Sequence, residues 1–595
     1  NHTLVLPIPM LMNPSFFLFS MHGFCGLLNS RALWVGILLC GSAASWGQDS
    51  LRSRTELIAP LSIPLVLAGN FGELRPDHFH TGLDFKTQGK EGFPVLAAAD
   101  GVVARVKVSP VGYGRAVYMN SPNGLTTVYA HLRRFSPALE TWILNEQYRL
   151  ERFSVDLFPK RAFAFQQGDT LGWSGNSGSS GGPHLHFEVR ETATERPINP
   201  LLWNFPVEDH VAPQLDALWV LPMQGAEIQG KSRPFRAVHQ KDTLKIAGEV
   251  RFAAEAMDRL DAANNRCGVY GLAVNLDGEP WFSWRIDTLD FSVNRDMNAH
   301  AYYPVWAREG SQVHRLHRLP GNRLPVYRSE SMTNALVLTP GESAEIQVVA
   351  TDIHGNQTER TWWCKGVEQR VVEPSAGKGE LYPYNQKGFV QGASGGRVQI
   401  PAYAFYEDYG FELNVLEGGR WLVGDPGQPA RKSLTVRLPL PSDTAFGRKV
   451  SNEVWLAAVL DESGEVDGVY TGKVSGPEFI FQTKTCGTYE LRQDTVPPQL
   501  TPQKQHLSAG EPDVLRMGSR SELRFNTSDA LSGIKKIQGL LDGEWILIRW
   551  DPKRERIWYE LGDERHAKGA RSALYISVED AVGNETTWSG WVQFP

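Results

Sequence analysis

Histidine is concentrated in one stretch of this 595-residue chain, and that concentration limits how the stretch can fold. Five of the 15 histidines lie between residues 71 and 190. Four of them stand in the motifs His80-Thr-Gly-Leu-Asp84, Tyr129-Ala-His131-Leu132 and His184-Leu-His186-Phe-Glu188. Catalytic zinc sites are built from histidine and carboxylate ligands. A fold that uses these motifs together must bring three separate segments to one place.

The segments around the motifs have the pattern of short strands. Apolar and β-branched residues alternate between glycine turns, which predicts antiparallel strands. The predicted strands are 95–99, 101–108, 116–119, 125–129 and 184–189. One further stretch, 137–148, places Leu139, Trp142 and Ile143 at helical spacing. We expect a helix there, inside an otherwise all-β region.

Spacing restricts which side chains can share a metal ion. Residues two apart in a strand face the same side, so His184 and His186 project together. A catalytic Zn²⁺ needs three protein ligands and one open position. His80, Asp84 and one histidine of the 184/186 pair can supply the three, and the remaining histidines are then free to move protons. His78 lies two residues before His80 and would share its face, so spacing does not choose between those two.

This ordered set of motifs resembles the lysostaphin/LytM-type zinc metallopeptidases. The resemblance covers about residues 66–200 and includes the glycine- and serine-rich run 175–183 before the last histidine motif. It implies an antiparallel β-sheet metallopeptidase domain with a zinc cofactor. It also implies that His80, Asp84 and His186 are the metal ligands, that His131 and His184 are catalytic, and that His78 is not involved.

All five positions carry the residue type that the family has there, so the resemblance implies an active enzyme. That enzyme is an exported zinc metalloendopeptidase that hydrolyses peptide cross-links of bacterial peptidoglycan, with His184 and His131 transferring protons and stabilising the oxyanion. One alternative is a non-catalytic cell-wall-binding or activator scaffold with a silent peptidase domain. Another is a peptidase that acts on proteins. The residues themselves indicate only zinc-dependent amide hydrolysis.

The first 47 residues have the outline of a secretory signal. Arg31 precedes the apolar run 32–39, and small residues follow at 41–45; this order is typical of a signal peptide. The run is too short to span a bilayer. We therefore expect an exported protein in the periplasm, the cell envelope or the extracellular space, with no membrane span after signal removal. Its expected partner is the peptidoglycan stem peptide, and cell-envelope proteins or glycans are candidate partners of the C-terminal β-modules. The net charge of −6 gives no reason to expect nucleic acid.

Beyond Trp203 the chain contains two copies of one pattern. The first copy opens at 211–215 and closes with Asp352-Ile-His-Gly-Asn356, and the second opens at 496–500 and closes with Asp580-Ala-Val-Gly-Asn584. Each carries an Asp-Gly turn, at 277–278 and at 542–543. The copies resemble bacterial immunoglobulin-like modules. The expected division is a leader at 1–47, a metallopeptidase domain at 48–203, an Ig-like β-sandwich at 204–370, a β-sandwich of unknown kind at 371–492 and an Ig-like β-sandwich at 493–595.

Four smaller expectations remain open. The insertion 135–167 is either a packed surface decoration or a border of the substrate groove. The run 172–183 is expected to be a turn-rich wall of that groove, which glycine would let a peptide backbone approach closely. Cys267 and Cys364 could form a disulfide. Most of the C-terminal tryptophans are expected in β-sandwich cores.

Overall fold

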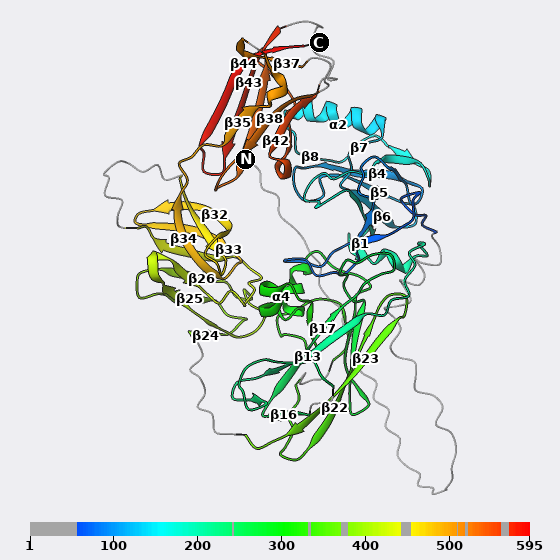
Figure 1. Cartoon of the computed structure of the whole chain (residues 1–595), viewed down its shortest axis with the longest axis vertical. Helices are drawn as coiled ribbons and strands as arrows, with labels where there is room; N and C mark the ends of the chain where they lie inside the picture. Colours follow the sequence, from blue (N-terminus) through cyan, green and yellow to red (C-terminus); the bar gives the residue numbers. More distant parts are fainter. Residues whose placement is uncertain are drawn as a thin grey trace, which may run out of the picture. The chain divides into compact units, whose positions relative to one another are not determined.

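The fold is described from a computed structural model (Figure 1). It describes residues 56–240, 243–330, 335–369, 379–441, 454–508, 510–517, 522–560 and 571–594. The predicted signal segment, 1–47, lies outside the described residues. Strands dominate the described chain and helices are few, which confirms the all-β expectation. Within the described residues, no helix combines the length and the apolar character needed to cross a membrane.

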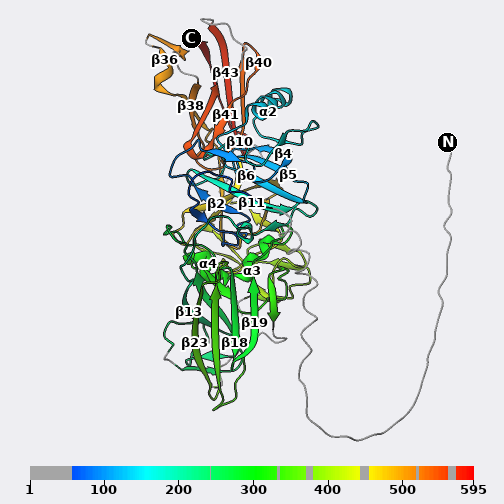
Figure 2. The ribbon, with the colours of Figure 1, turned by 90° about the vertical axis from the view of Figure 1, so that its right-hand side faces the viewer.

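One large sheet carries the histidine motifs. Its strands follow the order β1 (Leu67–Gly69), β2 (Leu83–Lys86), β11 (His184–Glu191), β6 (Leu125–Ala130), β5 (Arg115–Asn120), β4 (Gly101–Val108) and β8 (Val155–Leu157). All of these neighbours pair antiparallel, as predicted. Two short strands, β12 (Pro197–Ile198) and β9 (Ala164–Phe165), pair with β11 and β4. Figure 2 shows β2, β11, β6, β5 and β4 side by side.

The predicted helix is present beside a second, smaller sheet. That sheet consists of β3 (Pro94–Leu96), β10 (Thr170–Trp173) and β7 (Arg134–Phe135). Helix α2 (Pro137–Leu150) begins with proline, which suits a first helical turn, and ends where Glu151 adopts a left-handed conformation (φ 49°). Leu139 and Ile143 are buried on its inner face. The insertion thus adds a helix and also an edge strand, β8, beside β4.

Residues 214–366, here named the first β-module, form two sheets. The smaller contains β15 (Phe235–Ala237), β13 (Gln214–Pro222), β17 (Val250–Met257) and β20 (Val313–Arg315). The larger contains β14 (Glu227–Ile228), β16 (Leu244–Ala247), β23 (Gln357–Gly366), β22 (Ser343–Thr351), β18 (Gly271–Leu276), β19 (Glu279–Arg285) and β21 (Tyr327–Glu330). Two short helices, α3 (Met297–His300) and α4 (Tyr303–Glu309), lie between β19 and β20 in the chain.

Residues 380–493, the second β-module, have a different strand order. A two-stranded pair contains β24 (Glu380–Tyr382) and β27 (Tyr409–Phe411). The main sheet contains β25 (Gly388–Gln391), β26 (Arg397–Ile400), β30 (Leu434–Pro439), β33 (Glu478–Thr483), β32 (Val466–Ser475), β31 (Trp455–Leu460), β34 (Gly487–Gln493), β29 (Trp421–Val423) and β28 (Leu413–Val415).

Residues 499–593, the third β-module, repeat the design of the first. One sheet contains β35 (Gln499–Pro502), β38 (Glu522–Ser528), β42 (Arg556–Glu560) and β41 (Arg549–Asp551). The other contains β36 (Leu507–Ser508), β37 (Glu511–Arg516), β44 (Glu585–Gln593), β43 (Arg571–Asp580), β39 (Ile534–Leu541) and β40 (Glu544–Trp545). In both modules the larger sheet contains one parallel pair, β16 with β23 and β37 with β44.

The Asp-Gly turns of the two copies also have the same geometry. Asp277 and Gly278 have φ values of 50° and 81°, and Asp542 and Gly543 have φ values of 51° and 85°. Two successive residues with positive φ are the signature of a tight hairpin turn whose twist matches its strands. Shared sheet order and shared turns mean that the repeated sequence pattern encodes one repeated fold. The predicted domain boundaries stay predictions.

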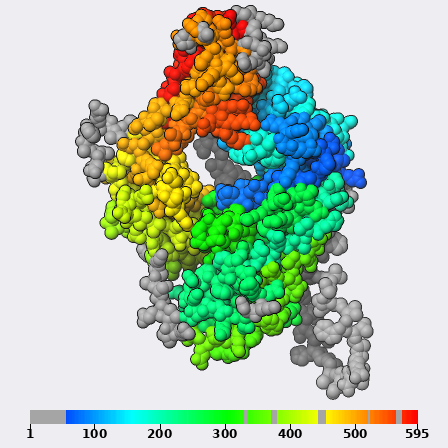
Figure 3. Space-filling view, in the orientation of Figure 1, coloured from blue at the N-terminus to red at the C-terminus, as the bar shows by residue number. Residues whose placement is uncertain are grey.

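The histidine-bearing region and the first β-module share one hydrophobic core. A single cluster of buried side chains extends from Leu57 to Cys364. The surfaces of the two regions, blue to cyan and green, meet in Figure 3. Cys267 and Cys364, which the sequence allowed as a disulfide pair, are both free and buried. Trp284 and Trp362 are core residues, as expected, whereas Trp363 is half exposed.

Candidate metal centre

Strand register brings the predicted metal-binding motifs together. His186 on β11 lies directly opposite Asp84 on β2 and, on its other side, opposite Ala130 at the end of β6. His131 follows Ala130 and has a left-handed backbone (φ 59°), a conformation uncommon for residues other than glycine. His80 lies in the loop before β2, where its backbone N–H donates to Glu73 O and its carbonyl accepts from Gly72 N.

Three ligand atoms converge within 3.2 Å of one another. His80 Nε2 lies 3.0 Å from His186 Nδ1, and Asp84 Oδ1 lies 2.9 Å from His186 Nδ1 and 3.2 Å from His80 Nε2. All three residues are buried. His78, by contrast, has a half-exposed side chain that contacts its neighbour Asp77. The structure therefore brings together His80, Asp84 and His186, and leaves His78 outside the cluster.

The remaining ring nitrogens show why this cluster suits a cation. His80 Nδ1 lies 2.8 Å from the carbonyl oxygen of Asn70, and His186 Nε2 lies 2.8 Å from Glu188 Oε1. Each of these acceptors is satisfied by a ring N–H, so in neutral rings the facing nitrogens are bare lone pairs. Two bare nitrogens 3.0 Å apart beside a carboxylate repel unless a positive charge lies between them. Nitrogen and carboxylate ligands are those that Zn²⁺ takes in proteins.

Charged partners hold the ligands from behind. Arg75 Nη2 donates to Asp84 Oδ2 at 3.0 Å, which leaves Oδ1 for the cluster. Glu188 is fully buried and accepts hydrogen bonds from Thr81 Oγ1 at 2.8 Å, from the Tyr113 hydroxyl and from Arg190 Nε at 2.6 Å. A carboxylate that accepts a hydrogen bond from the ring nitrogen not bound to the metal fixes the tautomer and orientation of a metal-binding histidine.

The ionisation of the cluster follows from these contacts. Burial disfavours the charged ring of His186, but the carboxylates of Asp84 and Glu188 outweigh it and raise the pKa of His186 to about 9. Burial lowers the pKa of His80. Burial also disfavours the Asp84 carboxylate, yet His80, His184 and His186 hold the pKa of Asp84 well below its usual range. The metal-free cluster therefore binds a proton, which a metal ion would have to displace.

Two further histidines flank the cluster. His184 Nδ1 lies 2.8 Å from Gly182 O and 3.0 Å from Ser180 Oγ, and His184 Nε2 lies 3.5 Å from Asp84 Oδ1. His131 Nδ1 lies 2.8 Å from Ser177 O. The His131 and His184 ring centroids are 4.7 Å apart. A proton on each Nδ1 satisfies the carbonyl beside it and leaves each Nε2 free to accept another proton.

The environment keeps His131 uncharged. Burial, together with the neighbouring His184 and His186, lowers the pKa of His131 to about 3. His131 is therefore neutral at pH 7 but a weak base in the metal-free chain, because a general base works best when its pKa lies near the working pH. The structure thus places both predicted catalytic histidines beside the metal-binding cluster, with His184 Nε2 facing Asp84 Oδ1 at 3.5 Å.

The glycine-rich run 172–183 forms a loop next to these histidines. Gly178 (φ 71°) packs so closely on the 112–114 turn that a Cβ there would lie 2.3 Å from Gly112 O. Gly181 and Gly182 meet nothing within 4 Å. At Gly178, therefore, the contact with the 112–114 turn of the same chain requires glycine. The expectation that the loop forms a wall of a substrate groove stays a prediction.

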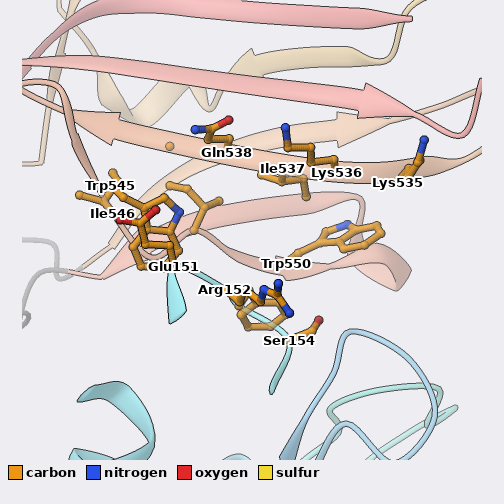
Figure 4. Close-up of a pocket in the computed structure, with 13 residues that line it drawn as sticks. Glu151, Arg152, Ser154, Lys535, Lys536, Ile537, Gln538, Trp545, Ile546 and Trp550 are labelled. Atoms are coloured by element: carbon orange, nitrogen blue, oxygen red, sulfur yellow. The ribbon is translucent and has the colours of Figure 1, made fainter. Parts of the chain in front are cut away.

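The insertion meets the third β-module across a pocket of about 540 Å³ (Figure 4). Its lining includes Glu151 and Arg152 after α2, and Lys536, Trp545 and Trp550 of the third β-module. None of its lining residues belongs to the histidine–aspartate cluster. The role of the insertion stays open between packing and substrate contact.

Sequence reasoning missed several supporting residues. Glu188 had a local signal, because it lies two residues after His186 on the same strand and so on the same face. Tyr113, Asn70 and Arg75 had none, since their positions depend on how distant segments pack.

Comparison with known proteins matches part of the histidine-bearing region to a protein family. Residues 78–147 match the model of peptidase family M23. Over 122 residues the chain is 35% identical to the DD-carboxypeptidase/endopeptidase Mpg of Neisseria meningitidis serogroup B, covering 20% of this chain and 22% of that protein. Over 132 residues it is 29% identical to the peptidoglycan DD-endopeptidase ShyA of Vibrio cholerae, covering 22% and 24%.

A solved structure also matches this part of the chain. A zinc-containing peptidase from Vibrio cholerae is 24% identical, with a TM-score of 0.19, over 24% of this chain and 39% of that one. The chain spans less than a quarter of the length of the two curated relatives named above.

Proposed function

We propose that this chain, which carries a peptidase family M23 domain, is an exported zinc endopeptidase that hydrolyses peptide cross-links of bacterial peptidoglycan. The observation that carries the proposal is the convergence of His80 Nε2, Asp84 Oδ1 and His186 Nδ1 within 3.2 Å, all three buried. In neutral rings the facing nitrogens would be two lone pairs beside a carboxylate, an arrangement that a metal cation stabilises. In the metal-free chain a proton on His186, whose pKa is raised to about 9, takes the place of that cation.

Zinc held by these three residues would lower the pKa of a water molecule and polarise the carbonyl of the scissile amide. Amide hydrolysis also needs a group that takes a proton and returns it to the leaving amine. We assign that role to the His131 and His184 pair. With its Nδ1 proton on a backbone carbonyl, each ring would present Nε2 to accept a proton, and burial keeps His131 neutral. An imidazolium formed at either ring would also stabilise an oxyanion.

The substrate is proposed from the names of the relatives. Mpg is named a DD-carboxypeptidase/endopeptidase and ShyA a peptidoglycan DD-endopeptidase. Peptidoglycan lies outside the cytoplasmic membrane, so export through the segment 1–47 is part of the same proposal. The other candidate is a scaffold that holds the metal without cleaving.

One experiment separates these functions. Zinc content and digestion of cross-linked muropeptides are measured for the wild type and for His186→Ala, with His78→Ala as the matched control because its half-exposed ring lies outside the cluster. We expect one zinc per chain and cleavage in the wild type and in the control, and loss of both in His186→Ala. Cleavage without zinc would refute the metal mechanism. Zinc without cleavage would favour the scaffold, and cleavage of casein alone would refute the substrate.

A further inference from the structure

A second kind of polar cluster lies at each linker that precedes a copy of the repeated module. The first acidic site consists of Asp209, Asp258 and Asp352, with His354 at its edge. The second acidic site consists of Asp494, Asp529 and Asp580. Ligand atoms of Asp209, Asp352 and His354 lie within 4.8 Å of one another, and so do those of the three residues of the second site.

The two sites occupy equivalent positions in the fold. Asp209 and Asp494 each stand five residues before the first strand of a module, β13 at 214 and β35 at 499. Asp258 and Asp529 directly follow β17 and β38, the strands that pair with β13 and β35. The last carboxylate comes from the Asp-x-x-x-Asn segment that closes each copy. The two sites therefore lie at the same place in the two modules.

The closing segments fix their carboxylates by the same hydrogen bonds. Asp352 Oδ1 accepts from Asn356 N at 2.9 Å and its Oδ2 from Asn356 Nδ2 at 2.7 Å. Asp580 accepts from Asn584 at the same two distances. Asn356 Nδ2 also donates to the carbonyl of Asp209 at 3.1 Å, as Asn584 Nδ2 does to Asp494 at 3.0 Å. Each closing segment thus holds one carboxylate and the linker backbone in fixed positions.

The carboxylate oxygens that these contacts leave without a hydrogen bond indicate a cation site. Asp209 has a side chain only 1% exposed, and its Oδ2 accepts no hydrogen bond from any described residue. His354 Nδ1 forms an ion pair with this oxygen at 3.5 Å, and the contact with Asp209 raises the pKa of His354. In the second site the buried Oδ2 of Asp529 likewise accepts no hydrogen bond among the described residues. There Val582 replaces the histidine, and within the described residues no lysine or arginine forms an ion pair with the three carboxylates.

The first site also has room for one small occupant. A cavity of about 10 Å³ touches Asp209 and Asp258 of this site but is not lined by Asp352, and about this volume holds one water-sized particle. Burial, with the charges of Asp209 and Asp352, raises the pKa of Asp258 to about 8, so a proton is the rival occupant. Carboxylates and backbone carbonyls are the ligands of hard cations such as Ca²⁺, whereas Zn²⁺ prefers nitrogen and sulfur.

We propose that the first and second acidic sites each bind one Ca²⁺ ion and that the bound ions fix the linkers before β13 and β35. Each ion would join a linker carboxylate, Asp209 or Asp494, to carboxylates carried by strand ends of the module. The first site also adjoins Asn70 and Phe71 of the peptidase domain, which line the same cavity. This proposal does not depend on peptidase activity.

The test is calcium binding to the full chain, stripped of metal and then loaded with one equivalent of zinc. We expect two Ca²⁺ per chain by calorimetric titration, with dissociation constants of about 10⁻⁴ to 10⁻³ M as in other extracellular modules. Asp209→Asn and Asp529→Asn should each retain one ion and the double variant none. Asparagine keeps the Oδ1 that accepts from Val211 N or Gly533 N, so the turn contacts survive.

The matched control is Asp461→Asn, since Asp461 accepts similar backbone hydrogen bonds in an exposed turn of the second β-module. It should still bind two ions. Calcium should also raise the thermal midpoint of the wild type and protect 204–213 and 494–498 from proteolysis, with both effects lost in the double variant. Absence of binding at 10-fold above that concentration range, unchanged stoichiometry in the variants, or uptake of zinc in place of calcium would each overturn the proposal. The proposal would also be overturned if Asp258→Asn raised the thermal midpoint without calcium, because that result would identify a proton as the occupant.

Discussion

Replacing Glu188 by glutamine should weaken zinc binding although Glu188 would not touch the metal. Its carboxylate lies 2.8 Å from His186 Nε2 and holds that ring so that Nδ1 faces His80 and Asp84. Glutamine keeps the shape but removes the charge. Loss of such a carboxylate behind a metal-binding histidine typically costs 10- to 100-fold in metal affinity, or about 1.4 to 2.7 kcal/mol.

The same substitution also disturbs a buried ion pair. Glu188 is fully buried and accepts a hydrogen bond from Arg190 Nε at 2.6 Å. Among the described residues, glutamine would leave the guanidinium with one carboxylate partner, the exposed Glu195 at 3.0 Å. Breaking a buried pair by removing one partner costs about 3 to 5 kcal/mol. Because the amide oxygen can still accept one hydrogen bond, we expect a loss of about 2 to 4 kcal/mol in the free energy of unfolding.

The assay is zinc affinity by competition with a chromophoric chelator, combined with urea unfolding followed by circular dichroism. Glu195→Gln is the matched control, because it removes the other carboxylate of Arg190 without touching His186. We expect the control to bind zinc as the wild type does. If folded Glu188→Gln also bound zinc with wild-type affinity, the positioning role of Glu188 would be wrong.

Two further predictions concern the same centre. First, zinc and a proton compete for His186, whose pKa is raised to about 9. Apparent zinc affinity should therefore rise with pH, by about tenfold per pH unit between pH 6 and 8. Calorimetry should detect about one proton released per zinc at pH 7, and a zinc affinity that does not change with pH would contradict the prediction. Second, a Cβ at Gly82 would lie 2.5 Å from Phe187 O and 2.9 Å from His186 Cε1. Gly82→Ala should therefore lower the free energy of unfolding in urea by about 1 to 3 kcal/mol and weaken zinc binding. Gly181→Ala is the control, because a Cβ at Gly181 meets nothing within 4 Å, and it should change neither property. Equal stabilities of these two variants would argue against the close approach at Gly82.

Local pattern in the sequence predicted the strands of the peptidase region and the helix that interrupts them. The strand over 101–108 and the helix from Pro137 were predictable because periods of 2 and 3.6 residues depend only on backbone geometry. The pairing of His184 with His186 on one strand follows from the same period. The two Asp-Gly turns were predictable because few residues adopt positive φ without strain.

The sequence by itself determined which residue types could form the metal centre, but only the tertiary structure decided their geometry. The register of β11 against β2 sets His186 opposite Asp84, and the loop contact with Asn70 turns His80 Nε2 toward both, while His78 stays at the surface. The acidic sites were equally hidden, because Asp209 and Asp352 are 143 positions apart in the sequence and meet only when the linker folds back on β22. Local periodicity is fixed within a few residues, whereas these meetings depend on how distant segments pack.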